Sequence, residues 1–235
     1  MAGQFERMDT ENGTGGSASP DTFGRSDEEA EETVTMTPRE LLTKLHTAWM
    51  NERLAPDLLP PQIEEIECML ELLRNMEVNT AKLEKKDIRL GVHKMEVDRI
   101  RYLISSYLRI RLAKIQEYCW DLQTKENTRN SQAPSLMSPE EQKFLKEYIE
   151  NLESHLKNMG TQHMPRTMQA LQPQTMSTSS NLDSFLFLRV SQDSSIIVDD
   201  ADGREEEVSL EAGSQHIIRY RPVAKLVPSG SVDLV

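Results

Sequence analysis

Cysteine, aromatic residues and long apolar runs are all scarce in this sequence of 235 residues. The two cysteines, Cys68 and Cys119, are too few for a disulfide framework and indicate reduced thiols. No apolar run approaches the roughly 18 to 20 residues that cross a bilayer. The N-terminus also lacks the basic start and apolar stretch of a secretory signal. We therefore expect a soluble intracellular protein that makes no contact with a membrane.

Aromatic residues make up only 5% of the chain, so leucine, isoleucine and methionine must do most of the packing. That composition is typical of helical proteins. The net charge is −12, and an acidic chain repels the phosphate backbone of nucleic acids. General binding of nucleic acid by this chain alone is therefore disfavoured, although a local basic surface would remain compatible with the composition.

Patterns that carry catalysis are also missing from the sequence. No serine or cysteine stands in a nucleophile motif, and the glycines at 13–16 lack the strand and lysine of a phosphate-binding loop. No histidine pairs with another histidine or cysteine at metal-ligand spacing; the five are His46, His93, His155, His163 and His216. We expect no catalytic residue, no metal site, no cofactor and no enzymatic activity.

The first 36 residues form a predicted disordered acidic tail. Glycine, serine and threonine dominate it, and acidic residues then cluster from Asp27 to Glu32. Such a segment buries too little apolar surface to offset the entropy of ordering it. It is either a solvating tail or a docking segment, and Ser26 before the acidic cluster is a candidate phosphorylation site.

Residues 37–165 are predicted to form a helical domain of four or five helices. Thr37, Pro38 and Glu40 form a capping box with proline at the first helical position, and Ser138-Pro139 with Glu141 repeats the signal. Gly160 stands where a helix often ends. The predicted helices run from 38 to just before Pro56, from about 63 to Lys85, from 87 to 118 and from 139 to 159, with a polar loop at 124–137.

The predicted third helix is apolar around an unusually wide arc. Lys94, Asp98, Arg101, Ser105 and Arg109 leave only a narrow polar strip at helical spacing. A helix that serves one core needs an apolar arc of little more than about 100°. The helix is therefore either central in its own domain or shared with a second subunit. On the second reading, the predicted protein interface consists of Arg99, Ile100, Leu103, Tyr107, Leu108, Arg109, Ile110, Arg111 and Leu112.

The basic residues of this helix allow two interpretations. With Tyr102 and Tyr107 between them, they could contact phosphates and stack on the bases of a nucleic acid. Alternatively, they pair with acidic residues of neighbouring helices or subunits, which is the role that arginine suits best. We favour ion pairs, because no single face carries all five: Arg99, Arg101, Arg109, Arg111 and Lys114.

The composition changes after Pro165. Residues 166–181 are polar and aperiodic and read as a linker, and 182–235 then follow a strand pattern. Expected strands are 185–190, 196–198, 208–210 and 216–220, with a turn at Asp202-Gly203, a short helix near 222–227 and a last strand at 231–235. About 55 residues make a marginal β domain that needs support from a neighbour. The fold class is thus mainly α, a helical bundle followed by a small β-rich domain.

Several long segments resemble the Sld-five family of GINS complex subunits. They are AWMNERLAPDLL, HKMEVDRIRYLISSYLRIRLAKI, MSPEE, HMP, LDSFLFLRV, GSQHIIRY and PVAKLVPSGSVDLV, in this order over residues 36–235. The resemblance implies a helical A domain followed by a β-rich B domain, the order that caps and periodicity also give. The tail and residues 166–180 depart from the family pattern.

The resemblance also implies a function. A member of this family is expected to be a non-catalytic scaffold subunit of the GINS heterotetramer, with three Psf-type subunits as partners. That complex joins Cdc45 and the MCM ring to form the replicative helicase, on chromatin in the nucleus, and would contact DNA only indirectly. The alternative is a nucleic-acid-binding adaptor that contacts DNA through the third helix or the β domain.

Overall fold

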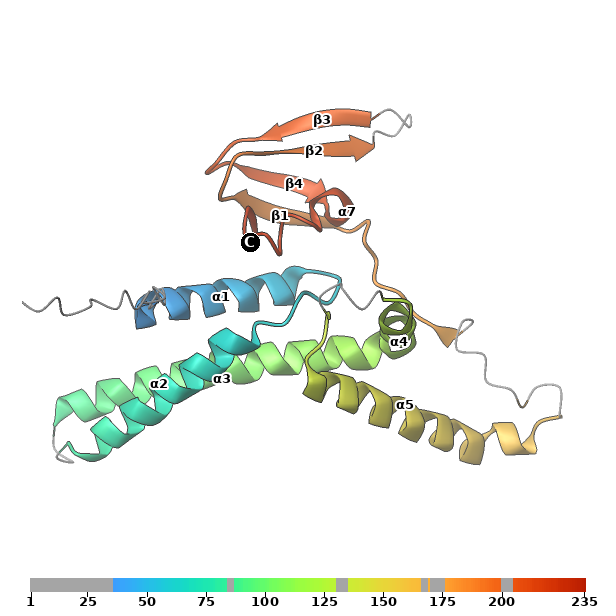
Figure 1. Cartoon of the computed structure of the whole chain (residues 1–235), viewed down its shortest axis with the longest axis horizontal. Helices are drawn as coiled ribbons and strands as arrows, with labels where there is room; N and C mark the ends of the chain where they lie inside the picture. The colour runs from blue at the N-terminus through green and yellow to red at the C-terminus, as the bar shows by residue number, and fades with distance from the viewer. Residues whose placement is uncertain (1–35, 84–86, 130–134, 166–168, 170–175, 200–204) are drawn as a thin grey trace, which may run out of the picture. The chain divides into compact units, whose positions relative to one another are not determined.

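The computed structural model describes residues 36–83, 87–129, 135–165, 169, 176–199 and 205–235 (Figure 1). A helical part precedes a small part built of antiparallel strands, so the predicted fold class is confirmed. The predicted acidic tail, Ser26, the turn at Asp202-Gly203 and most of the linker lie outside the described residues.

Helices α1 and α5 begin where their sequence signals predict. Helix α1 spans Pro38–Leu54, and α5 spans Pro139–Met159. The Thr37 and Ser138 side chains each accept a hydrogen bond from the backbone N–H three residues on, and both capping boxes are complete. Gly160 caps α5 with a φ of −140°, so it ends the helix without the left-handed conformation that often selects glycine.

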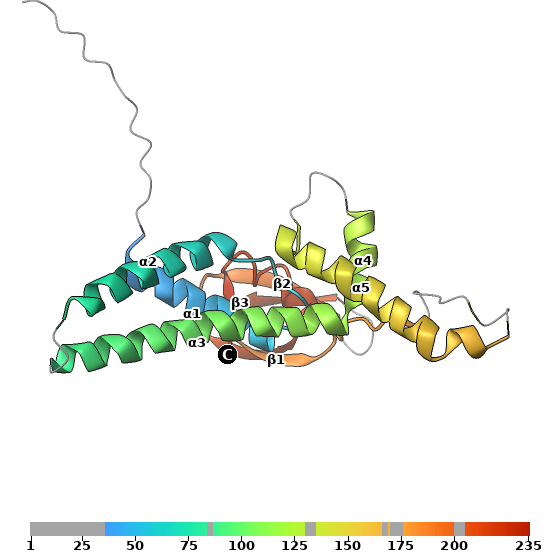
Figure 2. The same ribbon diagram turned by 90° about the horizontal axis from the view of Figure 1, so that it is seen from below.

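Helices α2 and α3 form a long antiparallel pair. Helix α2 spans Ile63–Ala81 and α3 spans Ile88–Glu117, close to the predicted bounds. Figures 1 and 2 show α2 alongside the N-terminal half of α3. The first half of α5 packs on α3 and α4, whereas its C-terminal half extends away from the other helices in both views.

The predicted polar loop at 124–137 is wrong in its first part, because helix α4 spans Cys119–Thr128. The backbone bends at Tyr118, where α3 ends, and the helix that follows is short and polar. An ion pair between Lys125 and Asp121, one helical turn apart, supports it, and the Thr124 hydroxyl donates to the Trp120 carbonyl. Only two of its side chains are buried, so the apolar periodicity that identifies a helix is weak here.

The strands form two antiparallel sheets. Strands β1, Phe185–Val190, β4, Gln215–Arg219, and β5, Val232–Leu234, make one sheet in the order β4-β1-β5. Strands β2, Ser194–Asp199, and β3, Glu205–Leu210, make the other. A single helical turn, α7 (Tyr220–Val223), replaces the longer helix predicted near the C-terminus.

The β domain shares its core with the end of α1. Ala55 and Leu59 belong to the same buried cluster as Leu188, Tyr220 and Val232. The backbone N–H of Leu234 also donates to the Asn51 Oδ1 atom over 2.8 Å. The support that a β domain of this size needs comes from α1 and the loop after it.

Candidate interaction surfaces around helix α3

A buried ion network ties α3 to α1 and α5. The Arg111 guanidinium donates to both carboxylate oxygens of Glu141, at 2.7 and 3.0 Å, and to Glu52 Oε2 at 3.1 Å. Its remaining donors reach the carbonyl oxygens of Leu59 and Leu136. Lys114 Nζ donates to the other oxygen of Glu52 at 2.8 Å. Every charge in the network therefore has an opposite charge within hydrogen-bond distance.

Burial strengthens the ion pairs of this network and acts on the pKa values of its two basic members. Arg111 and Glu52 are fully buried, and Glu141 is nearly so. Burial alone would lower the pKa of Arg111, but its hydrogen bonds to Glu141 and the charge of Glu52 outweigh it and raise the pKa. Burial lowers the pKa of Lys114, and Glu52 offsets only part of that effect. Removal of one partner would leave an uncompensated buried charge.

The nine predicted interface residues of α3 fall into two groups. Ile100, Leu103, Tyr107 and Arg111 are buried within this chain itself, so their side chains are not available to a partner. Tyr107 packs against α1 and α2, and its hydroxyl accepts a hydrogen bond from the backbone N–H of Gln62. The others keep exposed surface: Arg99, Leu108 and Arg109 are exposed, and Ile110 and Leu112 are half-buried. For this second group the interface remains a prediction.

The basic residues of α3 mostly bind carboxylates of the same chain. Arg99 donates to Glu96, Arg101 pairs with Glu77 and Asp98, and Arg111 and Lys114 belong to the buried network. Pairing with acidic residues of neighbouring helices is therefore correct for Arg101, Arg111 and Lys114, whereas Arg99 pairs within α3 itself. The structure gives no comparable contact for Arg109 among the described residues, and its side chain is exposed.

The N-terminal half of α3 carries an apolar stripe that this chain leaves open. Ile88, Val92, Met95 and Tyr102 are all exposed, and the exposed fraction is 62% or more for each. Their spacing of four, three and seven residues places them on one face of the helix, as in a coiled-coil seam. Arg99 stands between Met95 and Tyr102 on that face. We call these four apolar residues the α3 stripe.

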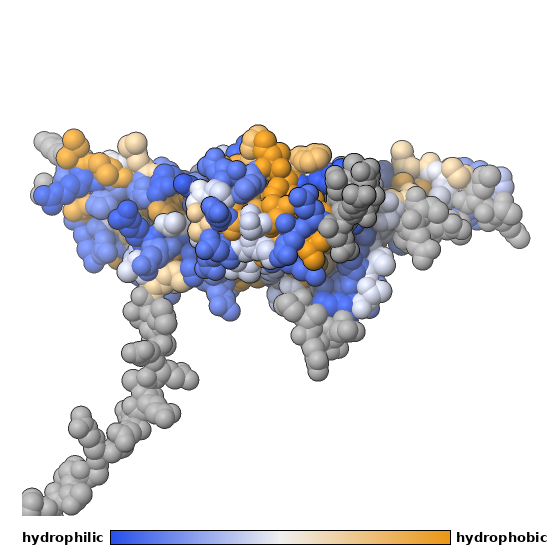
Figure 3. All heavy atoms as spheres, turned by 90° about the horizontal axis from the view of Figure 1, so that it is seen from above, coloured by the Kyte–Doolittle hydropathy of each residue, from blue (hydrophilic) through white to orange (hydrophobic). Residues whose placement is uncertain are grey.

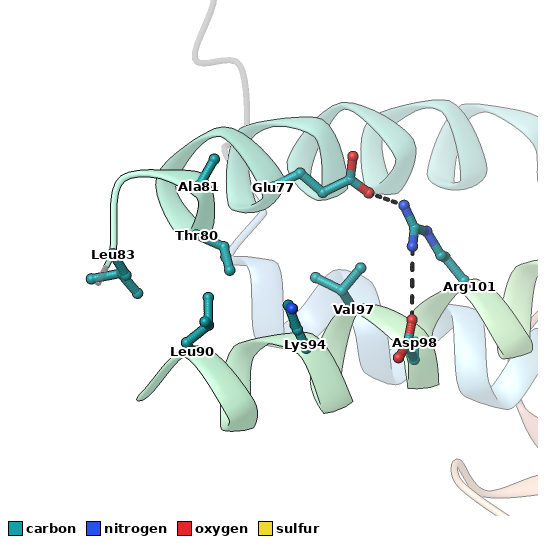
Figure 4. Close-up of a pocket in the computed structure, with 9 residues that line it drawn as sticks. All are labelled: Glu77, Thr80, Ala81, Leu83, Leu90, Lys94, Val97, Asp98 and Arg101. Carbon is teal, nitrogen blue, oxygen red and sulfur yellow. Dashed lines mark hydrogen bonds and ion pairs between the residues drawn. The ribbon is translucent and has the colours of Figure 1, made fainter. Parts of the chain in front are cut away.

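A hollow of about 510 Å³ lies between α2 and α3, near their connection (Figure 4). Leu90 and Val97 contribute apolar walls, while Lys94 comes from the same side of α3. Arg101 bridges Glu77 of α2 and Asp98 of α3 at one end of the hollow. The charges of Arg101, Glu77 and Asp98 therefore neutralise one another in part.

In the described ranges, no group of three or more histidine, cysteine or acidic side chains is placed to hold a metal ion. No described helix is both long enough and apolar enough to cross a membrane.

Sequence reasoning missed the acidic members of the buried network. The sequence gives Glu141 only the role of a cap and, in a chain this acidic, assigns no role to Glu52. The Glu141 carboxylate does accept from the backbone N–H of Ser138, as a capping box requires, and it also binds Arg111. A signal existed for Glu52: it falls on the apolar face of α1, seven residues after Leu45 and three before Ala55, and lies inside AWMNERLAPDLL, one of the family-like segments.

Known proteins resemble the chain over both of its parts. Residues 62–160 match the family described as the GINS complex protein helical bundle domain, and residues 181–235 match the DNA replication complex GINS protein SLD5 C-terminus. The DNA replication complex GINS protein SLD5 of Rattus norvegicus is 43% identical over 218 residues, covering 92% of this chain and 98% of the relative. The chain belongs to the SLD5 family of GINS proteins.

The SLD5 relatives reach across distant eukaryotes. The SLD5 protein of Homo sapiens is 42% identical over the same shares of both chains. That of Arabidopsis thaliana is 25% identical over 201 residues, covering 81% of this chain and 89% of the relative. The suspected family resemblance is thereby confirmed, and the SLD5 names connect the chain with DNA replication.

Proposed function

We propose that the chain is a non-catalytic scaffold subunit of a GINS heterotetramer with three Psf-type subunits. In this proposal the complex activates and stabilises the Cdc45–MCM–GINS helicase during initiation and elongation, on chromatin in the nucleus. The SLD5 family supports the complex, and the α3 stripe is the structural observation that carries the scaffold role. The division into a tail of residues 1–36, an A domain of 37–165 and a B domain of 182–235 is part of the same proposal.

The geometry of the α3 stripe supports the proposal that a helix of another subunit packs on it. Four large apolar side chains on one helical face recur at the spacing that lets two helices interlock. Obligate interfaces resemble a core cut in half, and exposed apolar surface of this extent on a helix is costly in a free subunit. The exposed Leu108 and the half-buried Leu112 leave further apolar surface in the C-terminal half of α3.

The alternative of a DNA-binding adaptor has less support at α3. Arg99, Arg101 and Arg111 bind carboxylates of the chain itself, so contacts with phosphates would first have to break those pairs. The net charge of −12 also disfavours binding to the phosphate backbone of DNA. We therefore favour the scaffold.

The test is to express the full chain alone and with three Psf-type subunits, and to measure mass in solution. We expect the chain alone to aggregate, and the co-expressed chain to elute as one complex with a single copy of each subunit. A monodisperse monomer that does not bind the other three subunits would overturn the proposal. Salt-sensitive DNA binding by the pure chain would favour the adaptor instead.

A further inference from the structure

We propose that the outer face of the β4-β1-β5 sheet is a docking site for a peptide segment of another protein, with large apolar side chains flanked by carboxylates. We call it the β1 outer face. It consists of Phe185, Phe187, Arg189, Ile217, Arg219 and Val235. The inference deepens the proposed function, and rests on it in taking the chain as a scaffold, but it concerns a surface separate from the α3 stripe.

The register of the sheet places three apolar side chains in one row across its outer face. Phe187 pairs with Ile217 of β4, and the backbone N–H of Val235 donates to the Phe187 carbonyl from the other side. The exposed fractions are 63% for Phe187, 60% for Ile217 and 55% for Val235. Phe185, two residues along β1 on the same face, is equally exposed.

The inner face of the same strands fills the core. Leu188 and Val190 of β1, and Leu234 of β5, are buried. A β domain that uses its inner face for its own core has no internal reason to place phenylalanine and isoleucine outside as well, because exposed positions of an antiparallel sheet are ordinarily polar. Figure 3 shows hydrophobic residues exposed over the strands of this domain.

Two arginines flank the apolar row. Arg219 pairs with Phe185 in the register, and its guanidinium lies 5.4 Å from the centre of the phenylalanine ring. Arg189 follows Phe187 on the other side of the row. Among the described residues, no ion pair within 4.0 Å involves either arginine. However, the hydrogen bond from Arg221 and the charge of Arg219 together lower the pKa of Asp183, and Asp233 stands opposite Arg189 on β5. In a chain of net charge −12, two such arginines around an apolar row fit a partner that supplies the carboxylates.

The size of the surface indicates a peptide rather than a whole subunit. Strands lie about 4.8 Å apart and alternate residues about 6.8 Å apart, so three strands and three rows cover on the order of 10 by 14 Å. Obligate subunit interfaces are far larger, at 2,000 Å² or more of buried surface. A short segment held by two or three apolar anchors and two ion pairs would bind reversibly and would be sensitive to salt.

Single-stranded nucleic acid is the competing occupant, since exposed aromatic rings beside arginines also stack bases. One observation favours a peptide. Ile217 and Val235 occupy two of the three positions in the central row, and aliphatic side chains offer no ring for a base to stack on.

Photo-cross-linking in the assembled complex identifies the occupant. The full chain with Phe187→p-benzoylphenylalanine is co-purified with three Psf-type subunits, incubated with nuclear extract and irradiated, and the cross-linked peptide is sequenced by mass spectrometry. The matched control carries the same group at Lys143, which is highly exposed on α5. We expect cross-links at Phe187, above the Lys143 control, to a segment with at least two large apolar residues and a net negative charge.

A synthetic copy of that segment, labelled with fluorescein, then measures affinity. We expect binding to weaken at least tenfold with the double change Arg189→Glu and Arg219→Glu, and about tenfold with Phe187→Ser. The control pair Lys143→Glu and Lys146→Glu should change binding less than twofold. Each variant complex should keep the mass of the unmodified complex, which separates loss of docking from loss of assembly.

Four results would overturn the proposal. They are no cross-link above the control, a cross-linked segment without acidic residues, a cross-link to residues 1–35 of the same chain, and a charge-reversed variant that no longer assembles. Binding of a labelled 30-residue oligothymidylate that Phe187→Ser abolishes would assign the surface to nucleic acid instead. If the unmodified chain forms no complex at all, the proposed function fails, and the peptide can still be sought on the full chain.

Discussion

Helix α3 passes through two different environments along its length. In its C-terminal half, Tyr107, Arg111 and Ile115 are buried against α1, α2 and α5 and in the ion network, although Leu108 and Arg109 are exposed. Its N-terminal half packs on α2 along one side and leaves Val92 and Met95 exposed on another. The same wide apolar arc therefore has two uses, as the chain's own core at one end and as open surface at the other. Substitutions at the two ends should consequently affect different properties.

The largest contrast is expected between two arginines of this helix. Arg111→Ala leaves Glu52 and Glu141 buried without their main partner, and should lower the free energy of unfolding by about 3–5 kcal/mol. Arg101→Ala removes only exposed ion pairs, and should cost at most about 1 kcal/mol. Urea unfolding of both variants provides the measurement. Equal losses would mean that the network contributes no more than a surface pair.

Two isoleucines give a matched apolar contrast. Ile115 has an exposed fraction of 0%, whereas that of Ile88 is 85%. Ile115→Ala should cost about 2–5 kcal/mol because it leaves a cavity, and Ile88→Ala should stay within about 0.5 kcal/mol. Thermal and urea unfolding decide this comparison. A large loss for Ile88→Ala would indicate that the stripe packs within the chain after all.

The exposed half should instead affect assembly. The double change Val92→Ala and Met95→Ala should weaken association with Psf-type subunits by about 1–2 kcal/mol, with the far-UV circular dichroism of the assembled complex unchanged. Lys146→Ala, on the exposed side of α5, is the control and should assemble normally. The measurement is a titration of co-purified subunits by analytical ultracentrifugation. Normal assembly of the double variant would remove the stripe from the proposed interface.

A smaller effect is expected at the two capping boxes. Ser138→Ala should cost about 1–2 kcal/mol, because it removes the buried Oγ atom that accepts from the N–H of Glu141, the residue whose carboxylate binds Arg111. Thr37→Ala, at an exposed cap, should cost about 0.5–1 kcal/mol. Urea unfolding again provides the measurement. The opposite order would show that the Ser138 cap and the ion network are independent.

The smallest expected effect concerns alkaline pH. Burial raises the pKa of Tyr107 above the value of about 10 in an unfolded chain, although the charge of Arg111 opposes this. The protonated Tyr107 hydroxyl therefore makes its full contribution to the free energy of unfolding below pH 10. That contribution is lost as the pH rises through the folded-state pKa. Tyr107→Phe should lose less stability than the unmodified chain between pH 10 and 11.5, while Tyr102→Phe should follow the unmodified chain. Identical pH profiles for all three proteins would contradict it.

The sequence predicts those features that depend on neighbouring residues. Thr37 and Ser138 begin helices because their caps and prolines act within one turn, and 185–190 was assigned to a strand with the observed bounds. Helix α4 was missed because its polar side chains give little apolar periodicity. Local patterns thus identify most helices and strands. Which residues pack against a given helix depends instead on contacts between segments distant in sequence.

The candidate site was less predictable for that reason. The arc of α3 shows which side chains need cover, but not whether α1, α2 or another protein supplies it. Burial of Arg111 requires Glu52, 59 positions earlier in the sequence, and Glu141, 30 positions later. Nothing in the spacing of any one helix brings those three together. The packing of the β domain on α1 is non-local in the same way.

The hydrogen bond between Asn51 and Leu234 bears on the kinetics of folding. Its two ends are 183 positions apart, so its formation closes a very long loop. Contacts between distant segments form slowly, because the chain loses the entropy of loop closure before the contact contributes any favourable energy. The α2–α3 hairpin and the β2–β3 hairpin need only local encounters. Docking of the β domain on α1 should therefore be the late step, following formation of both hairpins.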